Sequence, residues 1–451
     1  MSQNQKLSPA KFGLLGFQHM FAMFGATVLV PTLTGLSVSA TLLFAGLGTL
    51  LFHLITKGKV PAFLGSSFAF LGGYFAVRGM QGFTDAGLNW IPYAGAGVAC
   101  AGLVYVLVSQ LFRIFGTAKV MRFFPPIVTG PIIIAIGLIL SNTAINNAAA
   151  NWWIALIAIA IVVVCNIWGK GMIKIIPILL GVVGSYLVAA VTGQVDFTAV
   201  KDAAWVGLPF QMKDTVFSFF TDGVNGKLLL DAIIAMMPIS LATMMEHIGD
   251  MSAISSTVGE NYIEDPGLHR SLMGDGAATS LAALFGAPAN TTYGENTGVL
   301  ALTRVYNPAV VRMAAVLAIL FSFCPKFAAL ISCMPAATIG GVSLILYGMI
   351  SAVGVRNIVE NQVDFSKSRN VIIAALIIAL SLGIHFSSTL GCDTVKSVNG
   401  ALSFAIGSVN ISLSGLAVGS LVGIVLNAVL PGNDYEFGKN KKGDESANLQ
   451  V

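Results

Sequence analysis

The sequence predicts an all-α polytopic membrane protein whose fourteen transmembrane segments form two inverted repeats of seven. Its composition, the spacing of its apolar stretches and a matched pair of interrupted segments lead to this prediction. Of the 451 residues, 56% are hydrophobic and 10% are charged, whereas soluble domains carry about 25% charged residues. So few charges cannot cover a water-exposed surface, and most of the surface must therefore face lipid.

The apolar stretches number fourteen, and most are close to the roughly 20 residues that a spanning helix needs. The longest polar interruption, 194–227, separates seven stretches from seven. The predicted segments are 12–31, 39–56, 60–78, 93–115, 125–142, 151–168, 174–193, 228–249, 270–287, 290–305, 307–332, 335–354, 370–388 and 399–430.

Positive charge predicts the orientation of these segments. If the N-terminus is cytoplasmic, eighteen of the 24 Lys and Arg residues fall on the cytoplasmic side and six fall outside. Cytoplasmic loops carry such an excess in membrane proteins. We therefore expect a multi-pass protein of the cell membrane (inner or plasma membrane) with both termini in the cytoplasm.

Two segments, the third of each seven, are interrupted. Residues 60–78 begin VPAFLGSSFAF, and residues 290–305 contain NTTYGENTG. Corresponding interruptions in two halves indicate the binding site of an inverted-repeat transporter. We expect short strands at 62–66 and 290–294, each followed by a half-helix whose N–H groups face a cavity.

Residue spacing supports the duplication. Segment 1 carries Gln18-His19 and segment 8 carries Glu246-His247. The separation from His19 to Ser67 is 48 residues, and so is the separation from His247 to Glu295. Duplicating an odd number of spans inverts the second copy.

Acidic residues within apolar segments mark the candidate site. Glu246 and Asp250 are one turn apart on one helix and share a face, and Glu295 lies in the second interrupted segment. An ionisable residue in a bilayer costs at least about 2.5 kcal/mol and indicates function. Two carboxylates in a dry pocket repel each other, so at least one is expected to be protonated near neutral pH. We expect Glu246 to carry a transported proton, with Asp250 and His247 tuning its proton affinity.

Other acids and other chemistries receive a different interpretation. Asp231 and Asp275 lie near segment ends and are expected to be interfacial or structural. The five cysteines are scattered without metal-ligand spacing, so no metal site is expected. Clustered basic residues that would bind nucleic acid are lacking, and no HExxH, GxSxG or P-loop pattern indicates an enzyme. We expect no cofactor, only protons as the coupling ion.

Several motifs resemble those of the nucleobase–ascorbate transporter family, also called nucleobase:cation symporter-2. The likeness is closest to bacterial uracil permeases, through FAMFGATVLVP, FLGSSFAF, DPGLHRS, NTTYGEN and GGVSLILYG. The residues that match family motifs are Gln18, His19, Glu246, Glu295, Asn296, Thr297, Gly298, Thr303 and Arg304.

The resemblance implies a core domain that moves against a gate domain, with homodimerisation through the gate. The implied parts are core residues 10–118 and 228–333, gate residues 122–193 and 335–430, an extracellular linker at 194–227 and a cytoplasmic tail at 431–451.

The resemblance also implies a substrate site. Positions matching Glu246 and Glu295 hold the base, and backbone groups at Phe68, Tyr293 and Gly294 complete the pocket. The expected supporting residues are Gln18, His19, Ser67, Asn296, Thr303 and Arg304.

The chemistry of uracil agrees with this set of groups. Its two ring N–H groups suit carboxylate acceptors, its carbonyls suit the N–H groups at a helix start, and Phe68 or Tyr293 offers an aromatic wall. Glutamate at 295 favours uracil, because purine-type members typically carry glutamine there. Asp250 departs from the uracil permeases, which have histidine at that place, whereas purine-type relatives often have aspartate. A xanthine or purine permease therefore stays open as an alternative, and an anion transporter of similar fold is disfavoured by the two acids.

Overall fold

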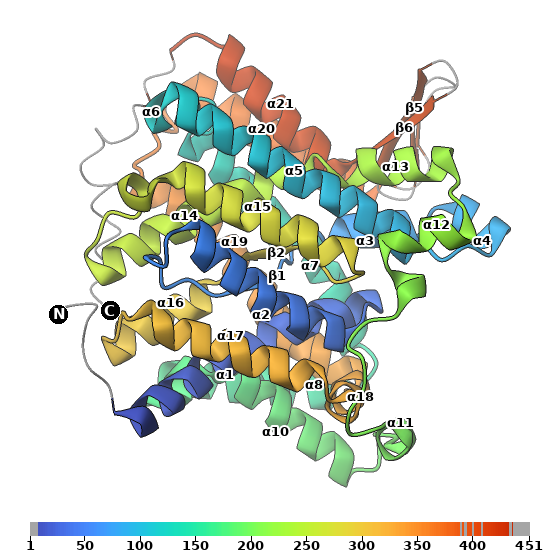
Figure 1. Cartoon of the computed structure of the whole chain (residues 1–451). Helices are drawn as coiled ribbons and strands as arrows, with labels where there is room; N and C mark the ends of the chain where they lie inside the picture. The colour runs from blue at the N-terminus through green and yellow to red at the C-terminus, as the bar shows by residue number, and fades with distance from the viewer. Residues whose placement is uncertain are drawn as a thin grey trace.

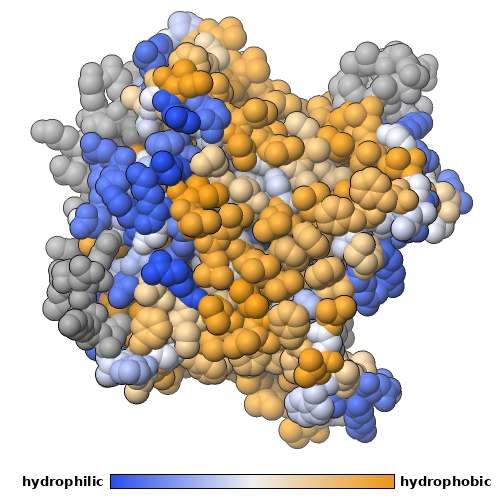
Figure 2. All heavy atoms as spheres, viewed as in Figure 1, coloured by the Kyte–Doolittle hydropathy of each residue, from blue (hydrophilic) through white to orange (hydrophobic). Residues whose placement is uncertain are grey.

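The computed structural model describes residues 8–387, 390–391, 395–398, 401–406, 409–432 and 435. Long helices run side by side across the molecule, and two short strands, β1 and β2, lie among them near its centre (Figure 1). Figure 2 shows a broad band of apolar side chains across the middle of one face, with hydrophilic residues gathered towards its left and right edges. This is the surface expected of a protein that lies in a bilayer.

The first seven predicted segments all contain regular structure. The elements of this half, including its short connecting helices, are α1 (Pro9–Thr34), α2 (Val38–Ile55), β1 (Leu64–Ser66), α3 (Leu71–Arg78), α4 (Gln81–Ala86), α5 (Ile91–Phe115), α6 (Thr117–Met121), α7 (Pro126–Ala148), α8 (Trp152–Ile167), α9 (Met172–Ile175) and α10 (Pro177–Val191).

The linker and the second half follow in the same order. Their elements are α11 (Thr198–Asp202), η1 (Met212–Asp214), η2 (Val216–Ser218), α12 (Phe219–Asp222), α13 (Gly226–Met236), α14 (Ile239–Val258), η3 (Ile263–Gly267), α15 (Leu268–Leu284), β2 (Asn290–Thr292), α16 (Gly294–Thr303), α17 (Pro308–Ser322), α18 (Pro325–Ser332), α19 (Ala336–Glu360), α20 (Ser368–Phe386), β3 (Leu390–Gly391), β4 (Val395–Val398), β5 (Ala401–Ile406), β6 (Val409–Ser414) and α21 (Gly415–Val429).

Local sequence explains where the first helix begins and ends. The hydroxyl of Ser8 accepts a hydrogen bond from the Lys11 amide at 3.4 Å, and Pro9 occupies the first helical position. Both residues are favoured there because the first amides of a helix have no partner within it. Gly35 ends the helix with φ of 83°, a left-handed conformation that glycine adopts without steric cost.

The membrane spans fall into several kinds. Among the described residues, seven helices are long and apolar enough to cross a membrane, and the bent pair α17–α18 makes an eighth. Three more, α8, α10 and α21, are apolar but shorter. The remaining predicted segments are α15 and the two strand–helix units, β1–α3 and β2–α16. The chain is therefore a multi-pass membrane protein.

The packing of the helices confirms that the halves are repeats. β1 pairs with β2 in antiparallel register, and α7 packs along α19. Helix α2 packs on α17 just as α15, its counterpart, packs on α5. Likewise α19 contacts α8, and α7 contacts α20. Each contact recurs when the two halves exchange places, as two related halves of seven segments require.

Small residues allow the closest of these approaches, between α7 and α19. A Cβ on Gly137 would lie 2.3 Å from the carbonyl oxygen of Tyr347. A Cβ on Gly354 would lie 2.7 Å from the carbonyl oxygen of Gly130. Only glycine permits these backbones to meet, which is a common way of packing helices in lipid.

Polar contacts at one end of the bundle join two connections that flank the third and ninth segments. Lys59, after α2, pairs with Asp265 in η3, and this hydrogen bond lowers the pKa of the exposed Asp265 carboxyl. Arg270 donates to the Ile55 carbonyl at 3.2 Å. The end of α2 is thereby tied to the start of α15.

Two predicted spans differ from the structure. Segment 14, predicted as 399–430, is helical only from Gly415, because 401–406 and 409–414 form the antiparallel strands β5 and β6. Alternating Val, Ser and Ile with an intervening Asn-Gly favour a hairpin over a helix. Segment 11 is not one straight span, since α17 and α18 meet at 88° just before Pro325.

The two ends of the bundle agree with an even number of spans. Helix α1 begins, and α21 ends, on the left-hand side of Figure 1. Which side of the membrane this is stays a prediction. The predicted tail, 431–451, lies mostly outside the described residues.

Candidate functional site

The strand pair β1–β2 forms the centre of the candidate site. Leu64, Gly65 and Ser66 pair with Thr292, Thr291 and Asn290. Two further hydrogen bonds extend the ladder, from the Ser67 amide to Ala289 at 2.8 Å and from the Tyr293 amide to Phe63 at 3.0 Å. The two interrupted segments thus satisfy each other's backbone, as non-helical chain inside a membrane requires. The strands predicted at 62–66 and 290–294 are confirmed.

Helix α16 begins directly after β2 and faces an acid. No side chain caps its start at Tyr293, and Gly294 is exposed. A Cβ on Gly294 would lie 3.8 Å from Oδ1 of Asp250. The first amides of a helix have no intrahelical partner and carry the positive end of its dipole. The start of α16 can therefore receive carbonyl oxygens beside a carboxylate.

Helix α14 contributes the acids. Glu246 and Asp250 are both partly exposed and lie one turn apart, and between them Gly249 is exposed with open space in front of it. The structure therefore places both carboxylates on a helix that borders open space.

A chain of polar contacts lies behind Asp250. The Thr292 hydroxyl donates to Oδ2 of Asp250 at 2.8 Å and lies 3.3 Å from Nδ1 of His247. The same Nδ1 is 3.1 Å from Oδ2 of Asp275, and the side chains of His247 and Asp275 are 0% exposed. These contacts join α14, α15 and β2.

The position of Asp275 differs from the predicted one. It was expected near a segment end, but it lies in the middle of α15 and is fully buried. The reason is that α15 packs against both α2 and α5 with small residues such as Gly274 and Gly276. The sequence signal for this burial is an acidic residue between two glycines in a spanning segment.

The residues of the first-helix motif lie next to α16. Asn296 donates through Nδ2 to the His19 carbonyl at 3.0 Å, and the same atom is 3.2 Å from Nδ1 of His19. Gln18, which precedes His19 in α1, is also buried. Thr303 bonds to the Val299 carbonyl, and Arg304 ends α16 with φ of 53°. His19 and Asn296 thus join α1 to α16, while Thr303 and Arg304 shape the helix end.

Residues around β1 fix the other wall. Ser66 donates to the Thr27 carbonyl at 2.8 Å, and the Tyr293 hydroxyl donates to the Ser66 carbonyl at 2.8 Å. The Tyr293 ring lies against Gly65, where a Cβ would come within 2.5 Å of it. The Ser67 hydroxyl is buried with no partner among the described residues. These contacts fix both strands in place.

An aromatic pair lies just after strand β1. The rings of Phe68 and Tyr347 meet edge to face at 5.9 Å, and both are buried. Tyr347 belongs to α19, so the pair joins the first interrupted segment to a helix of the other predicted domain. Tyr347 is not among the predicted site residues; its hydroxyl in the small-residue run GGVSLILYG is the only sequence signal for it.

Glu295 can be placed only by its backbone, as the second residue of α16. Its side chain lies outside the described part of the structure. Its convergence with Glu246 stays a prediction.

Known permeases resemble this chain over most of its length. A family model described as "Permease family" matches residues 10–390. A uracil permease of Bacillus subtilis (strain 168) is 40% identical over 439 residues, covering 94% of both chains. The putative pyrimidine permease RutG of Escherichia coli (strain K12) is 38% identical over 412 residues, covering 89% of both.

Solved structures show the same fold at low identity. The transmembrane domain of the cyanobacterial bicarbonate transporter BicA aligns with a TM-score of 0.60 at 15% identity, covering 93% of this chain and 97% of that one. Murine Slc26a9, an anion transporter, aligns with a TM-score of 0.61 at 11% identity, covering 94% and 69%. Fold, matched segments and sequence relatives agree, and the chain belongs to the nucleobase–ascorbate transporter family of permeases.

Proposed function

We propose that this permease imports uracil together with protons, by alternating access of a core domain against a gate domain. The observation that carries the proposal is the placement of Asp250, one turn from Glu246, beside the open start of α16 at Gly294. The names of its relatives, uracil permeases from several bacteria, support the substrate.

The chemistry of the site suits a neutral pyrimidine. Uracil presents two N–H donors and two carbonyl acceptors on a flat ring. Carboxylates at Glu246 and Glu295 accept from the N–H groups, and the amides that open α16 donate to a carbonyl. The ring of Phe68 provides an apolar wall. A substrate with a negative charge would meet the acids of α14 and be repelled.

The same acids support the proposed proton coupling. A carboxylate in a partly dry cavity beside a second carboxylate favours its protonated form. We propose that Glu246 takes up the proton and that Asp250 and His247 tune its proton affinity. Thr292 supports the tuning role, because it contacts both Asp250 and His247.

The moving parts are proposed from the fold. The core comprises 10–118 and 228–333, and the gate comprises 122–193 and 335–430. Phe68 and Tyr347 meet across this division. We further propose that the gate carries the surface for homodimerisation.

The test is uptake of labelled uracil by proteoliposomes with an imposed pH gradient, competed by a panel of bases. We expect accumulation that depends on an inwardly directed proton gradient and competition by unlabelled uracil far above that by xanthine. Strong competition by xanthine would favour the purine alternative, for which Asp250 is the observation. Uptake indifferent to the gradient would contradict proton coupling.

A further inference from the structure

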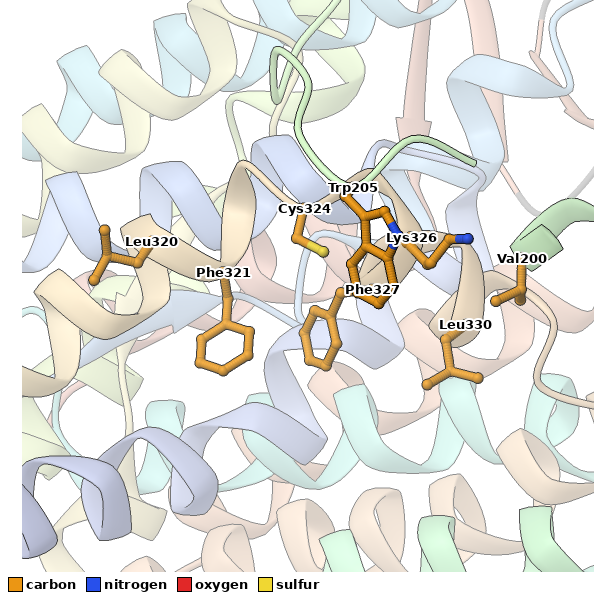
Figure 3. A pocket seen from close by; sticks show the side chains of 8 residues that line it. All are labelled: Val200, Trp205, Leu320, Phe321, Cys324, Lys326, Phe327 and Leu330. Atoms are coloured by element: carbon orange, nitrogen blue, oxygen red, sulfur yellow. The ribbon is translucent and has the colours of Figure 1, made fainter. Parts of the chain in front are cut away.

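A hollow of about 590 Å³ lies at the bend between α17 and α18 (Figure 3), and none of its lining residues belongs to the candidate site. Its floor is formed by Phe321, Phe327 and Leu330, and Trp205 of the linker stands over it. The lining is almost entirely carbon, and the ammonium group of Lys326 lies at its edge.

The walls of the hollow are held by the backbone. The amide of Gly207 donates to the Phe323 carbonyl at 3.0 Å, and the amide of Lys326 donates to the Ala204 carbonyl at 3.0 Å. These two bonds fix the linker across the 88° bend. The shape of the hollow is therefore fixed, because hydrogen bonds join the linker to the segment at the bend.

Exposure and charge indicate what fills it. Leu320 is 63% exposed and Trp205 is 73% exposed, so the apolar side chains around the hollow face the surroundings of the protein. The Lys326 ammonium lies 5.0 Å from the centre of the Trp205 ring. Trp and Lys side by side at the end of a spanning segment are typical of the level of the lipid headgroups.

We propose that this hollow binds one phospholipid from the leaflet on the linker side. An acyl chain would lie on Phe321, Phe327 and Leu330, and the phosphate would be paired with Lys326. The positive charge at the rim complements the phosphate, and the apolar floor complements the chain. This inference depends on the membrane location of the chain and not on the identity of its substrate.

The place of the site in the fold gives the lipid a consequence. α18 leads from the predicted core into the predicted gate, and the Tyr186 hydroxyl of α10 donates to the Leu330 carbonyl at 2.9 Å. The bound lipid would therefore contact the connection between the parts that have to move against each other.

The experiment uses the full chain in nanodiscs that contain a phospholipid with a photoactivatable group on its acyl chain, and a matching diacylglycerol that lacks phosphate. Cross-linked positions are mapped by peptide mass spectrometry. We expect labelling enriched in residues 198–208 and 318–331. Labelling spread evenly over all lipid-facing helices would overturn the proposal, because it would indicate ordinary boundary lipid.

Two variants distinguish the contribution of the phosphate contact from that of the acyl-chain contact. Lys326→Gln is expected to reduce phospholipid labelling about two- to fivefold, as for a partly exposed ion pair, and to leave diacylglycerol labelling unchanged. Leu330→Trp fills the hollow and is expected to reduce labelling by both probes. Lys213→Gln, at an exposed linker lysine outside the lining, is the control. Equal phospholipid labelling in Lys326→Gln and in the control would contradict the phosphate contact.

Discussion

Asp250 is held in place by a hydrogen bond from Thr292, and Thr292 in turn contacts His247, which contacts Asp275. A carboxylate fixed in this way keeps its position when a substrate leaves. Such preorganisation reduces the cost of binding, because fewer side chains have to be ordered.

The i,i+4 spacing of Glu246 and Asp250 was sufficient to predict that they share a face of one helix. The pairing of His247 with Asp275 could not be predicted in the same way. It depends on how α15 packs against α14, which no spacing within either segment encodes.

Replacing Glu295 tests the substrate contact. Glu295→Gln is expected to weaken uracil binding about ten- to a hundredfold, because a charged hydrogen bond contributes about 1.5–3 kcal/mol. Binding to the purified protein is measured by calorimetry. Asp364→Asn, an exposed acid in the loop after α19, is the matched control. Unchanged affinity in Glu295→Gln would exclude a direct contact.

Replacing Glu246 tests the coupling. Glu246→Gln mimics a permanently neutral side chain, so uracil exchange is expected to persist while accumulation driven by a pH gradient is lost. Coupling between proton and substrate is reciprocal, so uracil affinity is also expected to lose its pH dependence. Asp250→Asn is expected to shift the pH profile without abolishing binding. Gradient-driven accumulation by Glu246→Gln would assign the proton to another residue, with Asp250 the next candidate.

The buried pair of His247 and Asp275 makes a separate prediction about stability. Asp275→Ala removes the buried carboxylate next to His247 and is expected to destabilise the protein by about 3–5 kcal/mol. The double variant His247→Phe with Asp275→Leu replaces the pair by apolar groups and is expected to recover much of the loss. Thermal unfolding of the purified protein measures both. A single variant as stable as Asp364→Asn would show that the contact contributes nothing.

At the level of elements, the glycines between α7 and α19 decide how closely the two helices approach. The sequence indicated segments 5 and 12 as counterparts, each opening with Pro and small residues. The strands β3 to β6 escaped prediction, because hydropathy alone does not separate an apolar strand from a short apolar helix.

Two glycines of α19 provide a matched comparison. Gly354→Leu would place a Cβ 2.7 Å from the Gly130 carbonyl, whereas Gly348→Leu meets nothing within 4 Å. We expect Gly354→Leu to destabilise the protein by at least about 1–3 kcal/mol through overpacking, and Gly348→Leu to have little effect. Thermal unfolding in detergent compares them. Equal loss in both variants would mean that the α7–α19 contact is not close in solution.

At the level of the whole molecule, the site is open on one side. Gly294, Gly298 and Ala301 are exposed at helical spacing along α16, and Gly249 is exposed on α14. In Figure 1, α14 and α16 lie towards the side on which α1 begins. Phe68 and Tyr347 are buried together beside the site. We infer access from the side that the charge bias predicts to be cytoplasmic.

Thiol labelling tests this access and the orientation together. In a background without the five native cysteines, Gly298→Cys is expected to react with an impermeant reagent in inside-out vesicles, and uracil is expected to protect it. Gly226→Cys, exposed at the start of α13, is expected to react in right-side-out vesicles. Reaction of both positions from the same side would contradict the orientation.

The pairing of β1 with β2 also constrains how such a protein can arise or be divided. Each strand comes from a different half, and each satisfies the other's backbone inside the bilayer. A single seven-segment half would carry a bare strand edge in lipid, where every unpaired group costs several kcal/mol. Two halves expressed as separate chains would therefore have to insert in opposite orientations and find each other before either could persist. Fusion of the halves into one chain through the linker removes the need for two separate chains to find each other.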